Sequence, residues 1–315
     1  MMINSPIFYM GNKYKLLNQL KPLFPKNIDT FYDLFGGSGS ISLNVKANKI
    51  IYNELNYNVY KLFELFKIYD SKEIISHIEK RIKEFHLPTI SCDVRTKHYQ
   101  EEYKQEHNIN YLRFRTFYNE SEKNYLDLYT LTFFSFCNLI RFNSKSQFNM
   151  PFGNRCFLNE HKPLITGCCY IMNKINIELK NEDALSFIEK NINCFNQNDF
   201  IYLDPPYTNT LAVYNEQRAS FGGWNIKDDL KLFELLELLN KKGIKWGLSN
   251  VFKNKDYTNN HLIKWCEKNN WNVNHLNCEY ASLGKGKSNT DEVYICNYST
   301  NKQTTIFDFI GGNND

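Results

Sequence analysis

Two short apolar segments, each followed by polar residues, constrain the fold more than any other feature of the chain. The first, TFYDLF at residues 30–35, runs into the glycine-rich GGSGS at residues 36–40 and then into a helix-compatible stretch. The second, IIYNEL at residues 50–55, carries an acid, Glu54, near its end. Strand, glycine turn, helix, strand and acid follow one another in the βαβ unit of nucleotide-binding sheets. The sequence therefore predicts an α/β fold with a Rossmann-like sheet.

The glycine turn favours a nucleoside ligand without a pyrophosphate. Gly36, Gly37 and Gly39 depart from the dinucleotide pattern GxGxxG, because Leu43 and Asn44 follow where a third glycine would help. Glu54 can accept hydrogen bonds from both hydroxyls of a ribose. S-adenosylmethionine fits both features. An ordinary tight turn and a solvated strand end stay open as simpler interpretations.

A long helical stretch interrupts the strand pattern. Residues 58–107 carry apolar residues at three- and four-residue spacing, and an apolar stretch at residues 131–140 precedes a polar and aromatic loop or hairpin. Strand–helix alternation returns after about residue 165, with Gly243 expected to cap a helix at its C-terminus. We expect a discontinuous cofactor-binding catalytic domain, residues 1–58 and 164–315. A mostly helical domain, residues 59–163, interrupts it, with a hairpin near residues 141–153.

The segment FIYLDPPY at residues 200–207 carries the most specific chemistry. An apolar strand ends at Asp204, and ligand sites in α/β sheets lie at such carboxyl ends. The exocyclic amine of adenine is a poor nucleophile, and two acceptors placed on its hydrogens make its nitrogen more reactive. The Asp204 carboxylate and the Pro205 carbonyl are the candidate acceptors. Pro205 and Pro206 fix the backbone and have no N–H, while Tyr207 offers a face for stacking an extruded base. A sharp turn with an exposed Asp204 is the alternative.

Composition limits the remaining classes. Hydrophobic residues make up 42% of the 315 residues, without an apolar run of about 18 that would predict a membrane span. Charge at Lys13 and Lys15 argues against a signal peptide. Nine cysteines without a CxxC pair predict reduced thiols and no zinc site. The net charge of +4 permits an anionic partner.

From the lack of a signal peptide and from the cysteine pattern, we expect a cytoplasmic protein without a bound metal.

One lysine-containing loop, SLGKGKSN at residues 282–289, is not a phosphate-binding P-loop. The Walker pattern needs a glycine five residues before Gly286, and Ala281 stands there. Lys285 and Lys287 are therefore interpreted as a basic loop that touches phosphate or is simply solvated.

Four segments together resemble the Dam-like DNA adenine-N6 methyltransferases of the D12 class. They are FYMGNKYKLL at residues 8–17, DLFGGSGS at residues 33–40, FNSKSQFNMPFG at residues 142–153 and LDPPY at residues 203–207. Their order is that of the α group: cofactor loop, target-recognition insert, catalytic motif. WGLSN at residues 246–250 and TDEVYICNY at residues 290–298 resemble later strands of the family.

The resemblance implies S-adenosylmethionine as methyl donor and assigns residues to it. Glu54 is expected on the ribose, Asp204 near both the methionine and the target amine, and Asp183 near the adenine, although an acid at a helix start is also a common cap. The implied cofactor residues are Tyr9, Lys13, Asp33, Phe35, Gly36, Gly37, Ser38, Gly39, Glu54, Asp183 and Asp204.

The resemblance also implies a DNA interface in the helical domain. Arg141 stands where the family uses an arginine on a base, and a bidentate contact to guanine contributes about 1–3 kcal/mol of discrimination. Phe136 or Leu139 is the candidate wedge into the duplex, although both lie in an apolar run and fit a core equally well. The implied contacts are Arg141, Asn143, Lys145, Phe136, Leu139 and Arg155, with Lys145 and Arg155 on phosphates.

Two departures from the family pattern leave the recognition sequence open between GATC and another short site. Phe8 precedes Tyr9 where GATC-specific relatives carry a lysine, and Cys137 and Asn138 replace an Asn-Gly pair. The segment at residues 214–229 is expected to close on the flipped base. Tyr214, Arg218 and Trp224 are its candidate contacts.

The resulting prediction is an enzyme that moves a methyl group from S-adenosylmethionine to N6 of a flipped-out adenine in double-stranded DNA. A restriction endonuclease acting separately is a candidate partner. We expect a monomer, with a dimer as the alternative. An RNA adenine or protein glutamine N-methyltransferase and a catalytically inactive DNA-binding protein are the competing hypotheses.

Overall fold

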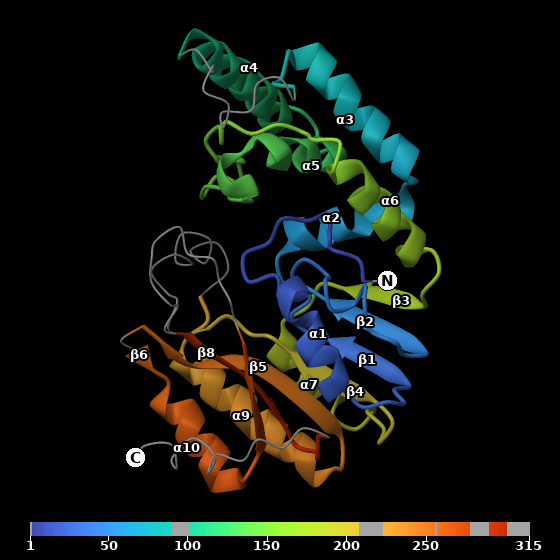
Figure 1. The fold of residues 1–315 in the computed structure, drawn as a ribbon, viewed down its shortest axis with the longest axis vertical. Coiled ribbons are helices and arrows are strands. Elements are labelled where there is room, and N and C mark those ends of the chain that lie inside the picture. The colour runs from blue at the N-terminus through green and yellow to red at the C-terminus, as the bar shows by residue number, and fades with distance from the viewer. Residues whose placement is uncertain (1, 90–100, 208–222, 256, 278–289, 301–315) are drawn as a thin grey trace, which may run out of the picture.

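A computed structural model describes residues 2–89, 101–207, 223–255, 257–277 and 290–300. Its centre is a mixed, mostly parallel sheet (Figure 1), as predicted. The strands pair in the order β3 (Ile177–Lys180), β2 (Lys49–Asn53), β1 (Thr30–Asp33), β4 (Phe200–Leu203), β5 (Lys245–Asn254), β8 (Thr290–Cys296) and β7 (Asn272–Leu276). A short strand, β6 (Tyr257–Thr258), pairs with β5.

Strands β3, β2, β1, β4 and β5 are parallel, and β8 runs antiparallel to both β5 and β7. Two register pairs fix the centre of the sheet. Asp33 at the end of β1 pairs with Tyr52 on one side and with Tyr202 on the other. The carboxyl ends of three parallel strands therefore meet at one edge, where a ligand site is expected.

Alternating side chains bury both faces of the sheet. On β4, Phe200 and Tyr202 belong to one core cluster, while Ile201 and Leu203 belong to the other. The second cluster packs the sheet against α7 (Ala184–Asn191), α9 (Ile226–Lys241) and α10 (Asn260–Asn269). The first packs it against η1 (Lys13–Leu16), α1 (Leu17–Leu20), η2 (Lys21–Leu23) and α2 (Tyr57–Ile68).

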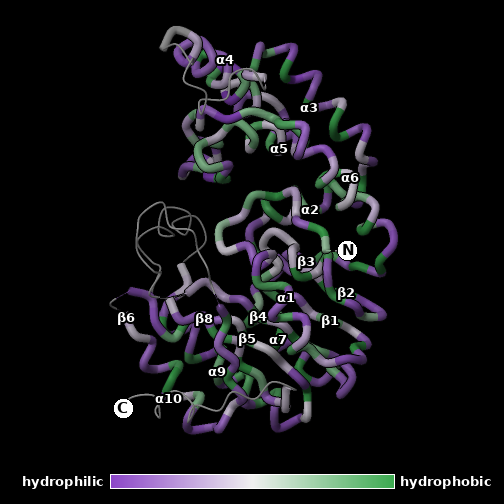
Figure 2. Tube along the Cα trace, viewed as in Figure 1, coloured by the Kyte–Doolittle hydropathy of each residue, from purple (hydrophilic) through white to green (hydrophobic). Residues whose placement is uncertain are grey.

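The first core cluster continues into the helices that connect β2 to β3. They are α2, α3 (Ser71–Phe85), α4 (Glu101–Glu120), α5 (Tyr125–Phe134), η4 (Phe136–Asn138) and α6 (His161–Met172). In Figure 1, α3, α4 and α5 lie at the end of the molecule away from the sheet. Figure 2 shows hydrophilic and hydrophobic stretches alternating along α3, which buries Ile74 and Ile78. Among the described helices, none combines the length and the hydropathy that a bilayer crossing requires.

Two isolated antiparallel bridges follow α5. Ser135 pairs with Phe152, and Phe142 pairs with Phe148. On either side of the inner pair, the backbone N–H groups of Asn143 and Asn149 donate to the carbonyls of Gln147 and Arg141 at 2.9 and 3.1 Å. Residues 141–149 therefore form a short hairpin, which we call the recognition hairpin.

The helix expected directly after the glycine turn is absent, so this prediction is wrong. Residues 34–48 form turns and irregular structure, with only two helix-like bonds, from Leu43 N to Gly39 O and from Val45 N to Ile41 O. The polar side chains bond elsewhere: Asn44 accepts from Ile3 N at 2.8 Å and donates to Ile3 O at 2.7 Å, and Ser42 donates to Asp33. Such side-chain bonds compete with helical backbone bonds.

Candidate active site

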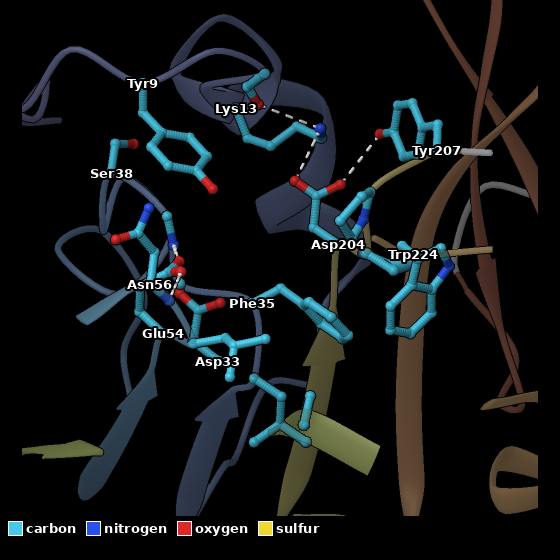
Figure 3. Close-up of a pocket in the computed structure, with 18 of the residues that line it drawn as sticks. Tyr9, Lys13, Asp33, Phe35, Ser38, Glu54, Asn56, Asp204, Tyr207 and Trp224 are labelled. Atoms are coloured by element: carbon cyan, nitrogen blue, oxygen red, sulfur yellow. Dashed lines mark hydrogen bonds and ion pairs between the residues drawn. The ribbon is translucent and has the colours of Figure 1, made fainter. Parts of the chain in front are cut away.

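A cavity of about 310 Å³ lies at the carboxyl ends of β1, β2 and β4 (Figure 3). In the strand order, β1 continues to β2 on one side and borders β4 on the other, so the cavity sits at the topological switch point. Its volume falls within the range of small-molecule sites. Ten of the eleven predicted cofactor residues line it: Tyr9, Lys13, Asp33, Phe35, Gly36, Gly37, Ser38, Glu54, Asp183 and Asp204. The LDPPY motif adds Pro205, Pro206 and Tyr207.

The eleventh predicted residue, Gly39, does not line the cavity but fixes the turn beneath it. A Cβ on Gly39 would stand 2.2 Å from the Phe63 ring, and the residue has φ +76°. A Cβ on Gly36 would stand 2.2 Å from the Tyr52 ring. The glycines are therefore required by the packing of the chain itself, which holds the backbone of the turn at the cavity wall.

Glu54 is bound to the same turn. Gly37 N donates to Oε2 at 2.9 Å and Asn56 N donates to Oε1 at 2.7 Å. The side chain is 6% exposed, and burial raises its pKa to about 7, although the two backbone N–H groups act in the opposite direction. Each carboxylate oxygen keeps a second lone pair, so Glu54 can still accept bonds from a ligand in the cavity.

Asp33 is a second buried acid at the cavity. It receives a hydrogen bond from Ser42 Oγ at 2.7 Å. Burial raises its pKa to about 7, and the neighbouring charge of Asp204 adds to the increase. Both acids therefore change charge near neutral pH. A positively charged ligand bound in the cavity would stabilise the ionised form of each.

Asp204 lies in a cluster of charged and hydroxyl groups (Figure 3). Lys13 Nζ is 2.9 Å from Asp204 Oδ2 and 3.4 Å from Glu292 Oε1. The Tyr207 hydroxyl lies 3.1 Å from Asp204 Oδ1 and 3.3 Å from Glu292 Oε1. Burial raises the pKa of Asp204, and Lys13 lowers it.

Sequence reasoning missed Glu292. It stands on β8 and is 1% exposed. The sequence did contain a signal for it, because Glu292 directly precedes the apolar strand residues VYIC. An acid in such a strand is expected to be buried and paired. Its partners, Lys13 and Tyr207, come from distant parts of the chain.

Two further predicted residues sit at the cavity with partners of their own. Asp183 caps α7 by accepting from Ser186 N at 2.9 Å, so the helix-cap role anticipated for it is present. Trp224 packs edge-to-face on Phe35 at 5.4 Å between ring centroids and donates its indole N–H to Asp229 at 2.7 Å. Tyr214, Arg218, Lys285 and Lys287 lie outside the described residues.

The two candidate wedge residues differ in environment. Phe136 is 54% exposed, whereas Leu139 packs against the core and is only half-buried. A strained turn supports Phe136: Cys137 and Asn138 have φ of 54° and 56°, and Phe136 N donates to Pro151 O at 2.9 Å. Phe136 is thus presented at the surface by a fixed backbone.

The candidate polar contacts with DNA lie on or beside the recognition hairpin. Arg141 Nε donates to Asn149 Oδ1 at 3.0 Å. Asn143 Oδ1 accepts from the backbone N–H groups of Lys145 and Gln147, both at 3.0 Å, so this side chain holds the hairpin turn. Lys145 is exposed. Arg155 is also exposed and donates to Asn138 Oδ1 at 3.0 Å.

The mostly parallel sheet, with acids at the carboxyl ends of its strands, is consistent with the class I methyltransferase fold. The chain matches the D12 class N6 adenine-specific DNA methyltransferases over residues 9–277, and it belongs to that family.

Three relatives illustrate the match. The modification methylase StsI of Streptococcus sanguinis is 38% identical over 308 residues, which are 95% of this chain and 43% of that protein. The type II methyltransferase M.FokI of Planomicrobium okeanokoites is 36% identical over 304 residues, 94% of this chain and 43% of that protein. The DNA adenine methylase of Escherichia coli (strain K12) is 24% identical over 250 residues, 77% of this chain and 78% of that protein. The chain thus spans less than half the length of the first two.

Proposed function

We propose that the cavity binds S-adenosylmethionine. This donor carries a sulfonium and an ammonium group, and the buried carboxylates of Asp33, Glu54 and Asp204 supply the opposite charge. The acceptor oxygens of Glu54 at the end of β2 suit the hydroxyls of a ribose. Tyr9 lies beside Gly37 and is 39% exposed, so its ring offers a face for the adenine base of the ligand.

We propose that the chain methylates N6 of an adenine extruded from duplex DNA. The observation that carries the proposal is the position of Asp204: it ends β4 inside the cavity and is followed by two prolines. When bound, S-adenosylmethionine supplies an activated methyl group. Asp204 and the Pro205 carbonyl hold the two hydrogens of the amine, while Tyr207 stacks on the base. Alignment and electrostatic stabilisation then provide most of the catalysis.

The helical region, residues 59–163, is the proposed target-recognition domain. Phe136 is favoured over Leu139 as the wedge because its side chain is exposed on a rigid turn. Arg141 is the proposed base contact, since its guanidinium is held at the hairpin by Asn149. Lys145 and Arg155, both exposed, are the proposed phosphate contacts.

The printed names of the relatives suggest a biological setting. Two of them are modification methylases or type II methyltransferases. We propose that this chain likewise modifies a short site, GATC or another, and protects it from an endonuclease that acts separately.

Transfer of a labelled methyl group tests the proposal. The protein is incubated with S-adenosylmethionine and duplex DNA, RNA or protein, and modified adenines in the DNA are mapped by sequencing. Label in N6-methyladenine of duplex DNA is expected. Label in RNA or protein alone would overturn the assignment, and no transfer to any acceptor would favour an inactive DNA-binding protein.

An Asp204→Ala variant tests the mechanism. It is expected to lose transfer while still binding DNA. Asp29→Ala is the matched control, because Asp29 is exposed just before the amino end of β1. Activity of Asp204→Ala within a few-fold of the unmodified chain would exclude the proposed role of the carboxylate.

A further inference from the structure

One side of α4, together with Lys123 three residues after it, forms hydrogen bonds with the second half of the recognition hairpin and with Met150, which directly follows it. The Tyr111 hydroxyl and the Arg115 guanidinium both donate to Met150 O at 2.9 Å. Asn119 Nδ2 donates to Phe148 O at 3.0 Å, and Phe148 N donates back to Asn119 Oδ1 at 2.8 Å. Lys123, just after the helix, donates to Ser146 O at 3.2 Å.

The spacing of the three side chains that belong to α4 follows from helical geometry. Tyr111, Arg115 and Asn119 are four residues apart, so they lie on one face of α4. Their partners, Phe148 and Met150, are two residues apart on the strand side of the hairpin, where backbone groups point the same way at every second position. One side of α4 therefore supplies hydrogen-bond partners to this backbone through its side chains.

Asn119 is the side chain of this set that pairs with both polar groups of one backbone residue. That residue, Phe148, is 1% exposed and packs edge-to-face on Tyr118 and Phe142. The next residue, Asn149, receives Arg141 Nε on its side chain and another guanidinium nitrogen on its carbonyl at 3.3 Å. Asn119 is thus connected to Arg141 through two consecutive residues of the hairpin.

We propose that this face of α4 sets the position of the recognition hairpin, with Asn119 as a positioning residue for base readout by Arg141. The proposal rests on the proposed DNA methyltransferase function. A bidentate contact to a base edge tolerates only small displacements, because both of its hydrogen bonds depend on direction. The hydrogen bonds from α4 to Phe148 and Met150, with that from Lys123 to Ser146, restrict such displacement of the hairpin backbone.

A purely structural role for Asn119 makes a different prediction. Loss of fold stability would lower transfer to all DNA sites alike. Loss of positioning would instead lower discrimination between the correct site and a site changed at the base that Arg141 reads. The test therefore compares kcat/KM on two duplexes rather than total activity.

The experiment first maps the site methylated by the unmodified chain and finds the base position at which Arg141→Ala relaxes preference. The ratio of kcat/KM on the correct and altered duplexes is then measured for Asn119→Ala. We expect this ratio to fall by about tenfold, the order of one lost bidentate contact. Asn108→Ala is the matched control, because Asn108 is an exposed asparagine of the same helix.

A double variant separates positioning from general damage. If Asn119 acts through Arg141, Asn119→Ala should lower the ratio no further in an Arg141→Ala background. Tyr111→Phe, which removes one hydroxyl, provides a milder second variant and should lower the ratio in the same direction even if Asn119→Ala does not fold.

Three results would overturn the inference while leaving the methyltransferase function intact. They are an unchanged ratio in both Asn119→Ala and Tyr111→Phe, an equal loss of kcat/KM on both duplexes, and an additive loss in the double variant. Absence of DNA methylation by the unmodified chain would instead reject the function on which the inference rests.

Discussion

Lys13 and Asp204 form a buried ion pair, with 2.9 Å between Nζ and Oδ2, and the Lys13 side chain is 6% exposed. Lys13 is the first residue of η1, and Asp204 directly follows β4. The charge of the proposed catalytic acid therefore depends on a residue outside its own motif. Glu292 lies 3.4 Å from the same ammonium, so two acids share one cation.

Replacement of Lys13 should shift the acid limb of the pH–activity profile to higher pH. The ammonium lowers the pKa of Asp204 by charge and by hydrogen bonding. In Lys13→Met the carboxyl group stays protonated to higher pH and cannot accept the amine hydrogen. The pH dependence of kcat measures the shift, with Lys15→Met, an exposed lysine nearby, as control. An acid limb that stays in place would show that Lys13 does not set the charge of Asp204.

Glu292→Gln should move the same limb in the opposite direction. The negative charge of Glu292 raises the pKa of Asp204, so its removal lets Asp204 ionise at lower pH. The Tyr207 hydroxyl loses a carboxylate partner as well, which should lower kcat more than it changes KM for DNA. Asp291→Asn, one residue earlier and partly exposed, is the matched control. Shifts of the same sign in the Lys13 and Glu292 variants would contradict the electrostatic account.

Affinity for S-adenosylmethionine should rise as pH increases through about 7. Burial raises the pKa of Asp33 and of Glu54 to about 7 from usual values of 3.8 and 4.5. One pH unit below that value only about a tenth of each group is ionised, so each can change the affinity for a cation by up to about tenfold. Calorimetric titration at pH 6 and 8 measures the change. Glu54→Gln should reduce it, and an unchanged pH dependence in that variant would exclude Glu54.

The same pKa values predict how stability depends on pH. The folded chain binds protons at Asp33 and Glu54 more tightly than the unfolded chain does. Their contribution to the free energy of unfolding is therefore fully present below about pH 4, falls as pH rises and levels off above about pH 7. Denaturant unfolding across this range, compared between the unmodified chain and Asp33→Asn, measures it. The prediction would be contradicted if the free energy of unfolding of Asp33→Asn changed with pH as steeply as that of the unmodified chain.

Gly39→Ala should destabilise the fold, whereas Gly167→Ala should not. A Cβ on Gly39 meets the Phe63 ring at 2.2 Å in a left-handed backbone, which we expect to cost about 1–3 kcal/mol. Gly167 lies inside α6, where a Cβ meets Ile3 at an ordinary 3.6 Å. Alanine there should stabilise by about 0.5–1 kcal/mol. Midpoints of urea unfolding provide the comparison, and equal midpoints would contradict both expectations.

The strands of the sheet could be predicted because their sequences carry local signals. Residues 200–203 are apolar throughout and are followed by Asp204, and the apolar residues 50–52 are followed by Asn53 and Glu54. β7, with the sequence NVNHL, has no such signal, since its alternate asparagines are polar. Its antiparallel pairing with β8, the next strand along the chain, gives it strand structure, and its own sequence does not indicate that pairing.

Those residues of the candidate site that belong to a recognisable sequence motif could be predicted from the sequence. The motifs identified Asp204, Glu54 and Lys13, which the structure gathers around one cavity. Glu292 and Asn119 could not be found in this way, because their importance depends on which groups face them. The helix predicted after Gly39 was wrong for the same reason: Asn44 bonds to Ile3, a contact that local propensity does not describe.

Phe136→Ala should slow methylation of fully paired DNA more than methylation of DNA with a mismatched target adenine. The exposed ring on its rigid turn is the proposed wedge, and the energy it supplies for base extrusion matters less when the base is already unpaired. Rapid-quench measurements of the transfer step on both duplexes give the comparison. Leu139→Ala should instead lower the unfolding midpoint, because Leu139 packs against the core. Its effect on the rate of methyl transfer should be similar for the paired and the mismatched duplex. If the mismatch restores the transfer rate of Leu139→Ala and not that of Phe136→Ala, then Leu139 and not Phe136 is the wedge.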